Sequence, residues 1–290
     1  MVPVHLEADI FFFMEGSGPP FSINVTNDNN MEIKTITTGS TLVSSATPDR
    51  STHRWKYAYT GLFQRRSKRI EVPVKCFYVK VNGHSVLIDA GWSREVVEHP
   101  MRHLGFGLWF ASEPVMKHGE SAKEQLAGQL IDAILMTHID CDHVSGLHDF
   151  DGILVFTSKV EFEYAAKKRL RYGKLVKGHE YQFLDFKSDD YAPFGQSCDL
   201  FGDDSIVAYL TPTHSAGSVI YRISDADGFA LIVGDNGYMK NSWQKGILPG
   251  PLYNAENMTR CLKWIKEQSQ HPDCLGVLCA HDPKNLNITE

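Results

Sequence analysis

The stretch Ile134-Leu135-Met136-Thr137-His138-Ile139-Asp140-Cys141-Asp142-His143 joins a short apolar run to four side chains that are good metal ligands. His138, Asp140 and Asp142 alternate, so their side chains would share one face of an extended segment. His143 follows directly and can join them where the strand ends and the chain turns. Buried carboxylates and imidazoles must be paired or bound to a metal, so the stretch predicts a metal site at the end of a buried strand. The alternative is a solvated loop with polar residues adjacent by chance.

Three later apolar runs also end in residues of the metal-binding type: Leu210 leads to His214, Val233 to Asp235 and Cys279 to His281. A single His after a strand is more often a surface residue than a ligand. Elements of one sheet layer deliver their ends to one edge, however, and sites are commonly built there. The candidate metal ligands are therefore His138, Asp140, Asp142, His143, His214, Asp235 and His281.

Length and composition limit the class of protein. A chain of 290 residues is long enough for one or two domains with a large core. Its hydrophobic fraction of 42% and charged fraction of 22% are ordinary for a soluble globular protein. A formal net charge of -6 argues against nucleic acid as the main partner, because binding phosphates needs a basic face.

Cysteine usage and hydropathy indicate the compartment. Six dispersed cysteines without a Cys-x-x-Cys pair predict free thiols in a reducing cytosol, not a disulfide framework. No apolar stretch is long enough to span a bilayer. The N-terminus lacks the positive start and the longer apolar middle of a secretory signal. We therefore expect a cytoplasmic protein with no membrane partner.

Composition along the chain suggests one folded domain after an extension. Residues 1–30 have turn and linker composition, so they are expected to be a poorly organised extension, with the folded domain at 31–290. Residues 38–70 are polar and are expected to form a long surface excursion. The aromatic-rich segment 92–115 could be the wall of a substrate pocket or a satellite core, and the sequence leaves both open.

The order of the predicted elements gives the fold class. Capping-box sequences at Ser121–Glu124 and Ser158–Glu161 predict helices that run to about Asp132 and Arg171, and Asn254 caps a last helix. This order predicts two packed sheets with helices outside, a four-layer αββα sandwich of the α/β class. Strands are predicted at 31–37, 72–81, 85–89, 134–136, 153–156, 181–184, 206–210, 219–223, 230–233 and 275–279.

These motifs resemble those of the metallo-β-lactamase superfamily: His-x-Asp-x-Asp-His, Thr-Pro-Thr-His-Ser-Ala-Gly-Ser, Gly-Asp and Ala-His-Asp, spread over nearly the whole chain from Met31 to His281. Within the superfamily the chain looks most like the N-acyl homoserine lactone lactonases. Asp235-Asn236-Gly237-Tyr238 matches their Asp-x-x-Tyr, and the segment Glu161–Ala165 resembles their helix. The resemblance implies the metallo-β-lactamase fold and a metal-dependent hydrolase of the quorum-quenching lactonase type.

By motif position, the resemblance implies two divalent metal ions, with zinc expected. His138, Asp140 and His214 would hold one ion, Asp142, His143 and His281 the second, and Asp235 would bridge them. Asp140 stands where the family usually has His, so the cluster carries one positive charge less. A less positive cluster is a weaker Lewis acid, which predicts a slower or more alkaline hydrolase. The added oxygen ligand also lets manganese or iron(II) compete with zinc.

The resemblance further implies that a hydroxide held between the ions opens the ester ring of a lactone such as an N-acyl homoserine lactone. Tyr238 would stabilise the oxyanion, and Asp142 would pass a proton to the leaving alkoxide. Packing at the edge of the site is the other role open to Tyr238. The expected partner is a small-molecule ester or lactone, and a homodimer is left open. The alternatives are a hydrolase of another ester, thioester or phosphoester, and a catalytically weak ligand-binding or regulatory protein.

Overall fold

The computed structural model describes residues 30–53, 65–168, 175–284 and 286–289, together with Trp55, Ala58, Tyr59, Gly61 and Tyr172. The expected extension over residues 1–30 lies, except for Asn30, outside the described residues. Met31 is already buried, with 3% of its surface exposed, and its backbone N–H donates to Asp225.

The first sheet has seven strands in the order β4-β1-β2-β3-β5-β6-β7. Strands β1 to β3 pair antiparallel, and Asn82-Gly83 forms the tight turn of the β2–β3 hairpin with positive φ at both residues. From β3 onward the pairs β3–β5, β5–β6 and β6–β7 are parallel. Their bounds are β1 Glu32–Ser44, β2 Arg69–Val81, β3 His84–Ile88, β4 Glu113–Val115, β5 Ala133–Leu135, β6 Leu154–Thr157 and β7 Tyr181–Phe183.

The second sheet has six strands in the order β13-β12-β11-β10-β9-β8. All neighbours pair antiparallel except β12 and β13, which are parallel. Their bounds are β8 Lys187–Ser188, β9 Gln196–Asp199, β10 Ile206–Leu210, β11 Val219–Ser224, β12 Phe229–Gly234 and β13 Cys274–Cys279.

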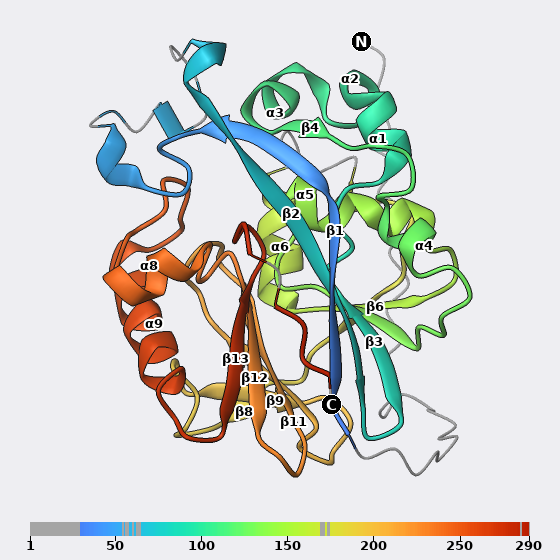
Figure 1. Cartoon of the computed structure of the whole chain (residues 1–290), viewed down its shortest axis with the longest axis vertical. Helices are drawn as coiled ribbons and strands as arrows, with labels where there is room; N and C mark the ends of the chain where they lie inside the picture. Colours follow the sequence, from blue (N-terminus) through green and yellow to red (C-terminus); the bar gives the residue numbers. More distant parts are fainter. Residues whose placement is uncertain are drawn as a thin grey trace, which may run out of the picture.

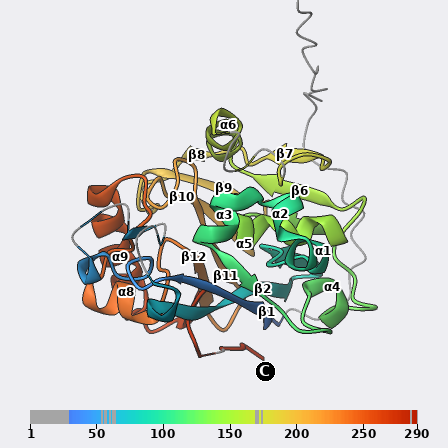
Figure 2. The same cartoon turned by 90° about the horizontal axis from the view of Figure 1, so that it is seen from above.

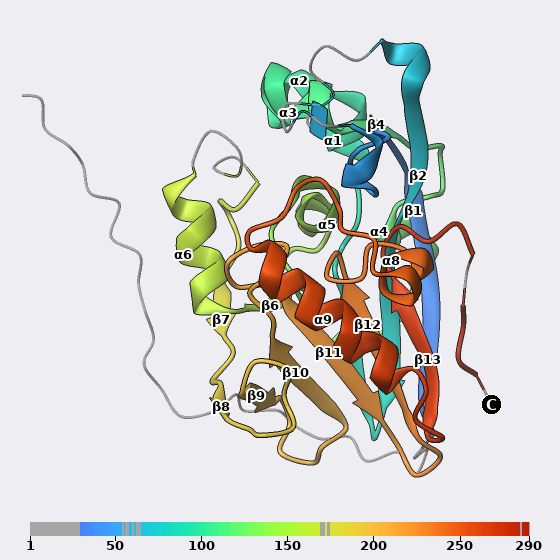
Figure 3. The same ribbon diagram turned by 90° about the vertical axis from the view of Figure 1, so that its left-hand side faces the viewer.

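The two sheets face one another and helices cover their outer faces (Figures 1 and 2). Side chains such as Phe77 and Leu135 of the first sheet and Val219 and Ile232 of the second form the core between the sheets. Outside the first sheet lie α1 (Arg94–Glu98), α4 (Ala122–Gln125) and α5 (Cys141–Val144). Outside the second lie α8 (Lys240–Lys245) and α9 (Ala255–Gln268), and Figure 3 shows α9 in front of β11 and β12. This confirms the predicted four-layer αββα sandwich.

The predicted surface segment over residues 38–70 is wrong at both ends, because β1 ends only at Ser44 and β2 already begins at Arg69. Strand β1 continues to Ser44, because its second half still pairs with β2 after a register shift between Thr37 and Ser40 and also pairs with β4. The polar side chains of Thr38 and Thr41 are buried there, so polarity alone misidentified the segment. Short 3-10 helices, η1 (Arg50–Thr52) and η3 (Arg66–Lys68), lie in the shortened connection.

The aromatic segment 92–115 is mostly helical, with α1 followed by α2 (Pro100–His103), α3 (Gly105–Ala111) and β4. Trp92 is fully buried in the core between the first sheet and the helices that cover it, whereas Phe106 is 65% exposed. The segment therefore contributes to the core at its start and is exposed further along.

Two predicted helices are shorter than expected. The capping box of Ser121 and Glu124 is present, but α4 ends at Gln125, shortly before Gly128 adopts a left-handed φ of 81°. Helix α6 spans Lys159–Lys167, and Arg171 is outside the described residues. The cap of the last helix is confirmed, since Asn254 accepts from the N–H of Asn257. Among the described helices, none has the length and apolar run needed to cross a bilayer.

Candidate metal centre

The site residues follow the ends of four strands at one edge of the sandwich. The segment after β5 carries His138, the segment after β10 carries His214, β12 leads directly to Asp235, and β13 leads to His281. The expected alternation stops at Asp140, which is the N-cap of α5. Asp142 and His143 therefore belong to a helix and not to an extended segment.

The structure brings all seven predicted ligands together. Ligand-type atoms lie within 4.8 Å of one another in each of three overlapping groups. The groups are His138, Asp140 and His214; Asp142, His143 and His281; and His138, His143 and Asp235. The first two groups share no residue, so the described residues provide two adjacent clusters of three.

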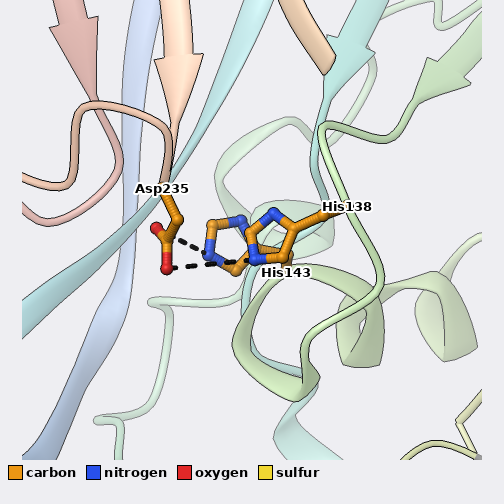
Figure 4. Close-up of side chains that lie close together, drawn as sticks. All are labelled: His138, His143 and Asp235. Atoms are coloured by element: carbon orange, nitrogen blue, oxygen red, sulfur yellow. Dashed lines mark ion pairs between the residues drawn. The ribbon is translucent and has the colours of Figure 1, made fainter. Parts of the chain in front are cut away.

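Asp235 lies between these two clusters, and Figure 4 shows its carboxylate facing His138 and His143. Oδ1 is 3.1 Å from Nε2 of His281 and 3.4 Å from Nε2 of His143. Oδ2 is 3.5 Å from Nε2 of His214 and 3.9 Å from Nε2 of His138. Each oxygen thus faces one cluster.

Three of the imidazoles are oriented by their Nδ1 atoms, which leaves Nε2 directed at the centre. Nδ1 of His143 donates to Asp89 at 2.8 Å, and Nδ1 of His281 donates to the carbonyl of Pro73 at 2.8 Å. Nδ1 of His138 lies 3.0 Å from Oγ1 of Thr137. Such outer contacts fix ring tautomer and orientation in metal sites.

The polar atoms at the centre are buried without ordinary partners. Among the described residues, Nε2 of His138, His143 and His281 has no hydrogen-bond partner, and neither has Oδ1 of Asp235. A buried polar group left without a partner costs about 1–3 kcal/mol. Imidazole nitrogens and carboxylate oxygens are ligands of divalent transition metals, so bound ions would satisfy these atoms. The residues fit the metal ions that the motifs imply.

The protonation of the centre is set by burial and by neighbouring charges. Burial, with a contribution from the nearby His143, lowers the pKa of His138 well below its ordinary value. Burial acts in the same direction on His143, but Asp89 and other carboxylates prevail and hold its pKa well above the ordinary value. Asp235 is held well below its ordinary pKa despite burial, because His281 and His143 face it.

Asp142 and Tyr238, the predicted catalytic residues, both lie at the centre. Oδ2 of Asp142 is 3.5 Å from Nε2 of His281, and burial raises the pKa of this carboxyl group. The Tyr238 ring stacks on the ring of His281 at a centroid distance of 4.3 Å. Burial, together with Asp235, raises the pKa of Tyr238 well above its ordinary value, so the phenol keeps its proton. Cys141, between two of the predicted ligands in the sequence, is buried.

Two buried carboxylates beside the site were not identified as functional from the sequence. Asp89 is fully buried and accepts from the backbone N–H and the hydroxyl of Thr137, at 2.8 Å each, as well as from His143. The sequence pattern predicts that Glu161 is half of a capping box. Ser158 does cap α6, but the Glu161 side chain turns away from the helix and accepts from Ile139 and Gly217. The available signal for Asp89 was a carboxylate at the end of a strand.

Comparison with known proteins identifies the family. The sequence profile of the metallo-beta-lactamase superfamily matches residues 69–268 of the chain. The chain therefore belongs to the metallo-beta-lactamase superfamily. Its two-sheet fold and its cluster of His and Asp side chains are those of a metal-dependent hydrolase.

Solved structures with this fold include several lactonases. An N-acyl homoserine lactone hydrolase with N-hexanoyl-L-homoserine at its catalytic metal centre is 17% identical, covers 87% of this chain and 93% of its own, and has a TM-score of 0.68. The dizinc quorum-quenching lactonase AidC is 16% identical, with 89% and 90% covered and a TM-score of 0.56. A probable metal-dependent hydrolase from Staphylococcus aureus is 16% identical, with 89% and 91% covered and a TM-score of 0.62. No curated protein sequence matches the chain. At these identities the likeness establishes the fold.

Proposed function

We propose that the chain is a dinuclear metal-dependent hydrolase that opens the ester ring of a lactone such as an N-acyl homoserine lactone. The observation that carries this proposal is the position of Asp235, whose two oxygens face two separate clusters of ligand-type side chains. A carboxylate shared between two ligand sets suits a two-metal site of the kind used in hydrolysis.

In this proposal, His138, Asp140 and His214 hold one ion, and Asp142, His143 and His281 hold the other. Zinc suits the mixed imidazole and carboxylate ligands, and manganese or iron(II) compete at the oxygen-richer site. When bound, the two ions would activate a water molecule and polarise the ester carbonyl.

Tyr238 and Asp142 provide the protein's own contribution to the reaction. The phenol of Tyr238 stays protonated because its pKa is raised, so it can donate a hydrogen bond to the oxyanion that develops from the ester carbonyl. The raised pKa of Asp142 makes this carboxylate a better proton acceptor. It can therefore take a proton at the centre and pass it to the leaving alkoxide.

The choice of a lactone as substrate is supported by the structural neighbours and by the Asp235-x-x-Tyr238 motif. The N-acyl homoserine lactone hydrolase and AidC were both solved with N-hexanoyl-L-homoserine, the ring-opened product, bound. Their low sequence identity leaves the acyl group open, so the proposal names the ester ring and not a chain length.

A substrate panel on metal-loaded protein tests the proposal. Lactones, thioesters, phosphodiesters and organophosphates are compared with and without a chelator. Lactone hydrolysis that the chelator abolishes and zinc restores is expected. His214→Ala should abolish it, whereas His271→Ala, a change at an exposed histidine outside the cluster, should not. Faster hydrolysis of a phosphodiester or thioester would replace the proposed substrate, and bound metal without any turnover would favour a ligand-binding role.

We also propose that the hydrolase domain comprises residues 31–290 and that residues 1–30 form an extension. The buried side chain of Met31 supports the boundary, as does the pairing of Ile33 with Ile288 near the other end of the chain. Removal of residues 1–30 should leave the thermal unfolding temperature and metal content unchanged; a clear fall in either would move the boundary.

A further inference from the structure

Glu161, at the start of α6, joins two segments that carry proposed metal ligands. It is 1% exposed, and each carboxylate oxygen accepts one backbone N–H. Oε1 accepts from Ile139 at 3.1 Å and Oε2 accepts from Gly217 at 3.0 Å. The two donors are 78 residues apart in the sequence (217 minus 139), so a single side chain fixes the spacing of two distant loops.

The segments that Glu161 joins carry one of the two ligand clusters. Ile139 lies directly between His138 and Asp140, and Gly217 lies three residues after His214. These three ligands form one complete cluster, in which Nε2 of His214 is 2.9 Å from Oδ2 of Asp140. The spacing of the two loops therefore sets the spacing of this cluster.

The first turn of α6 holds the His214 loop at a second point. The hydroxyl of Ser158 donates to the carbonyl of Gly217 at 2.6 Å and caps the helix by accepting from the N–H of Glu161 at 3.0 Å. A Cβ at position 217 would lie 2.2 Å from the backbone nitrogen of Glu161, so only glycine allows this approach. Both polar atoms of the Gly217 backbone are thus bound by the helix.

The other cluster has different supports. Asp89 holds the ring of His143, and the carbonyl of Pro73 holds the ring of His281. The N–H of Ala90 donates to the carbonyl of His143 at 2.9 Å. Glu161 accepts no hydrogen bond from these residues among those described, so its removal should affect the two clusters unequally.

We propose that Glu161 is a positioning residue that sets the metal affinity of the cluster formed by His138, Asp140 and His214, while the cluster of Asp142, His143 and His281 is maintained without it. A carboxylate suits this role because both of its oxygens accept, whereas a glutamine would direct an NH₂ group at one of the two N–H donors. The inference rests on the proposed two-metal centre but not on the lactone substrate.

The test is a metal titration of Glu161→Gln, with Glu163→Gln as the matched control, because Glu163 is an exposed glutamate on the same helix. Chelator-treated proteins are titrated with zinc by calorimetry, and bound metal is counted after dialysis. Wild type and Glu163→Gln should bind two ions. Glu161→Gln should keep one ion tightly and bind the other about 10–100-fold more weakly, the usual effect of removing an outer-shell contact.

Double variants identify which ion is affected. His214→Ala already disrupts the cluster that Glu161 supports. Adding Glu161→Gln to it should therefore change the affinity for the remaining ion very little. Adding it to His281→Ala should weaken the remaining ion, because the two changes then act on different clusters. The absorption of the cobalt(II)-loaded proteins gives a second readout, in which Glu161→Gln should lose the same bands as His214→Ala.

The inference would be overturned if Glu161→Gln bound both ions as tightly as the wild type, or if its affinity for both ions fell equally. It would also be overturned if the effects of Glu161→Gln and His214→Ala on metal affinity were fully additive. If Glu161→Gln does not fold, Ser158→Ala removes the bond to the Gly217 carbonyl and should weaken the same ion to a smaller extent; unchanged affinity there would overturn it as well. A wild type that binds two ions but hydrolyses no lactone would reject only the proposed substrate. A wild type that binds fewer than two ions would overturn both proposals.

Discussion

Replacement of Asp89 by Asn tests how far the outer contacts of the centre support the fold. Asp89 has a φ of 58°, a left-handed conformation that Asn tolerates better than other side chains. The substitution is also nearly isosteric, so it changes the chemistry of one side chain with little added backbone strain. Its consequences therefore report on hydrogen bonds and charge.

The hydrogen bonds of Asp89 indicate how much the substitution should lower the free energy of unfolding. Asp89 accepts three hydrogen bonds at 2.8 Å, two from Thr137 and one from His143. Asn has one acceptor oxygen, so at least one donor loses its partner in a site that is fully buried. Losing a bond to a charged group and leaving a buried donor unpaired should lower the free energy of unfolding by about 3 kcal/mol.

The assay is urea unfolding of the chelator-treated protein, followed by zinc titration of the folded protein. Asp204→Asn is the matched control, because Asp204 also has a positive φ, 61°, but is exposed. It should change the free energy of unfolding by less than about 0.5 kcal/mol. Zinc affinity of Asp89→Asn should fall about 10–100-fold because the ring of His143 is released. Equal stabilities and equal zinc affinities of the two variants would refute the assigned role of Asp89.

Three further outcomes follow from the site. Asp140→His should shift the pH–rate profile to lower pH, because it restores one positive charge to the centre; identical apparent pKa values would contradict the charge argument. Tyr238→Phe should lower kcat by about 100-fold, and a loss below about threefold in steady-state kinetics would assign the ring to packing. Zinc uptake should release protons and weaken as pH falls, because His143 and His281 have raised pKa values and must lose their protons to bind; calorimetry in buffers of different ionisation enthalpy measures this, and no proton release would contradict it.

The sequence predicted the strands near the site well because local chemistry determines them. Buried runs such as residues 134–136 and 230–233 are apolar throughout, and a polar residue follows each of them within two positions. Asn82-Gly83 and Asn254 act through backbone conformation and capping within a few residues. Features that depend on only a few neighbouring residues can be predicted from the sequence without knowledge of the tertiary structure.

Features that depend on distant partners could not be predicted in the same way. The polar second half of β1 is a strand because β2 and β4 pair with it, which the composition of residues 38–44 does not reveal. Glu161 has the local pattern of a capping box, yet its acceptors are used by Ile139 and Gly217 from other parts of the chain. These contacts depend on the tertiary arrangement of the segments around Ile139 and Gly217, which the local sequence does not reveal.

Anomalous diffraction from crystals of the zinc-loaded protein, recorded at the zinc absorption edge, tests the central claim most directly. The account predicts two peaks, one beside His138, Asp140 and His214 and the other beside Asp142, His143 and His281, with the Asp235 carboxylate between them. A single peak, or two peaks away from Asp235, in fully loaded protein would contradict a dinuclear centre.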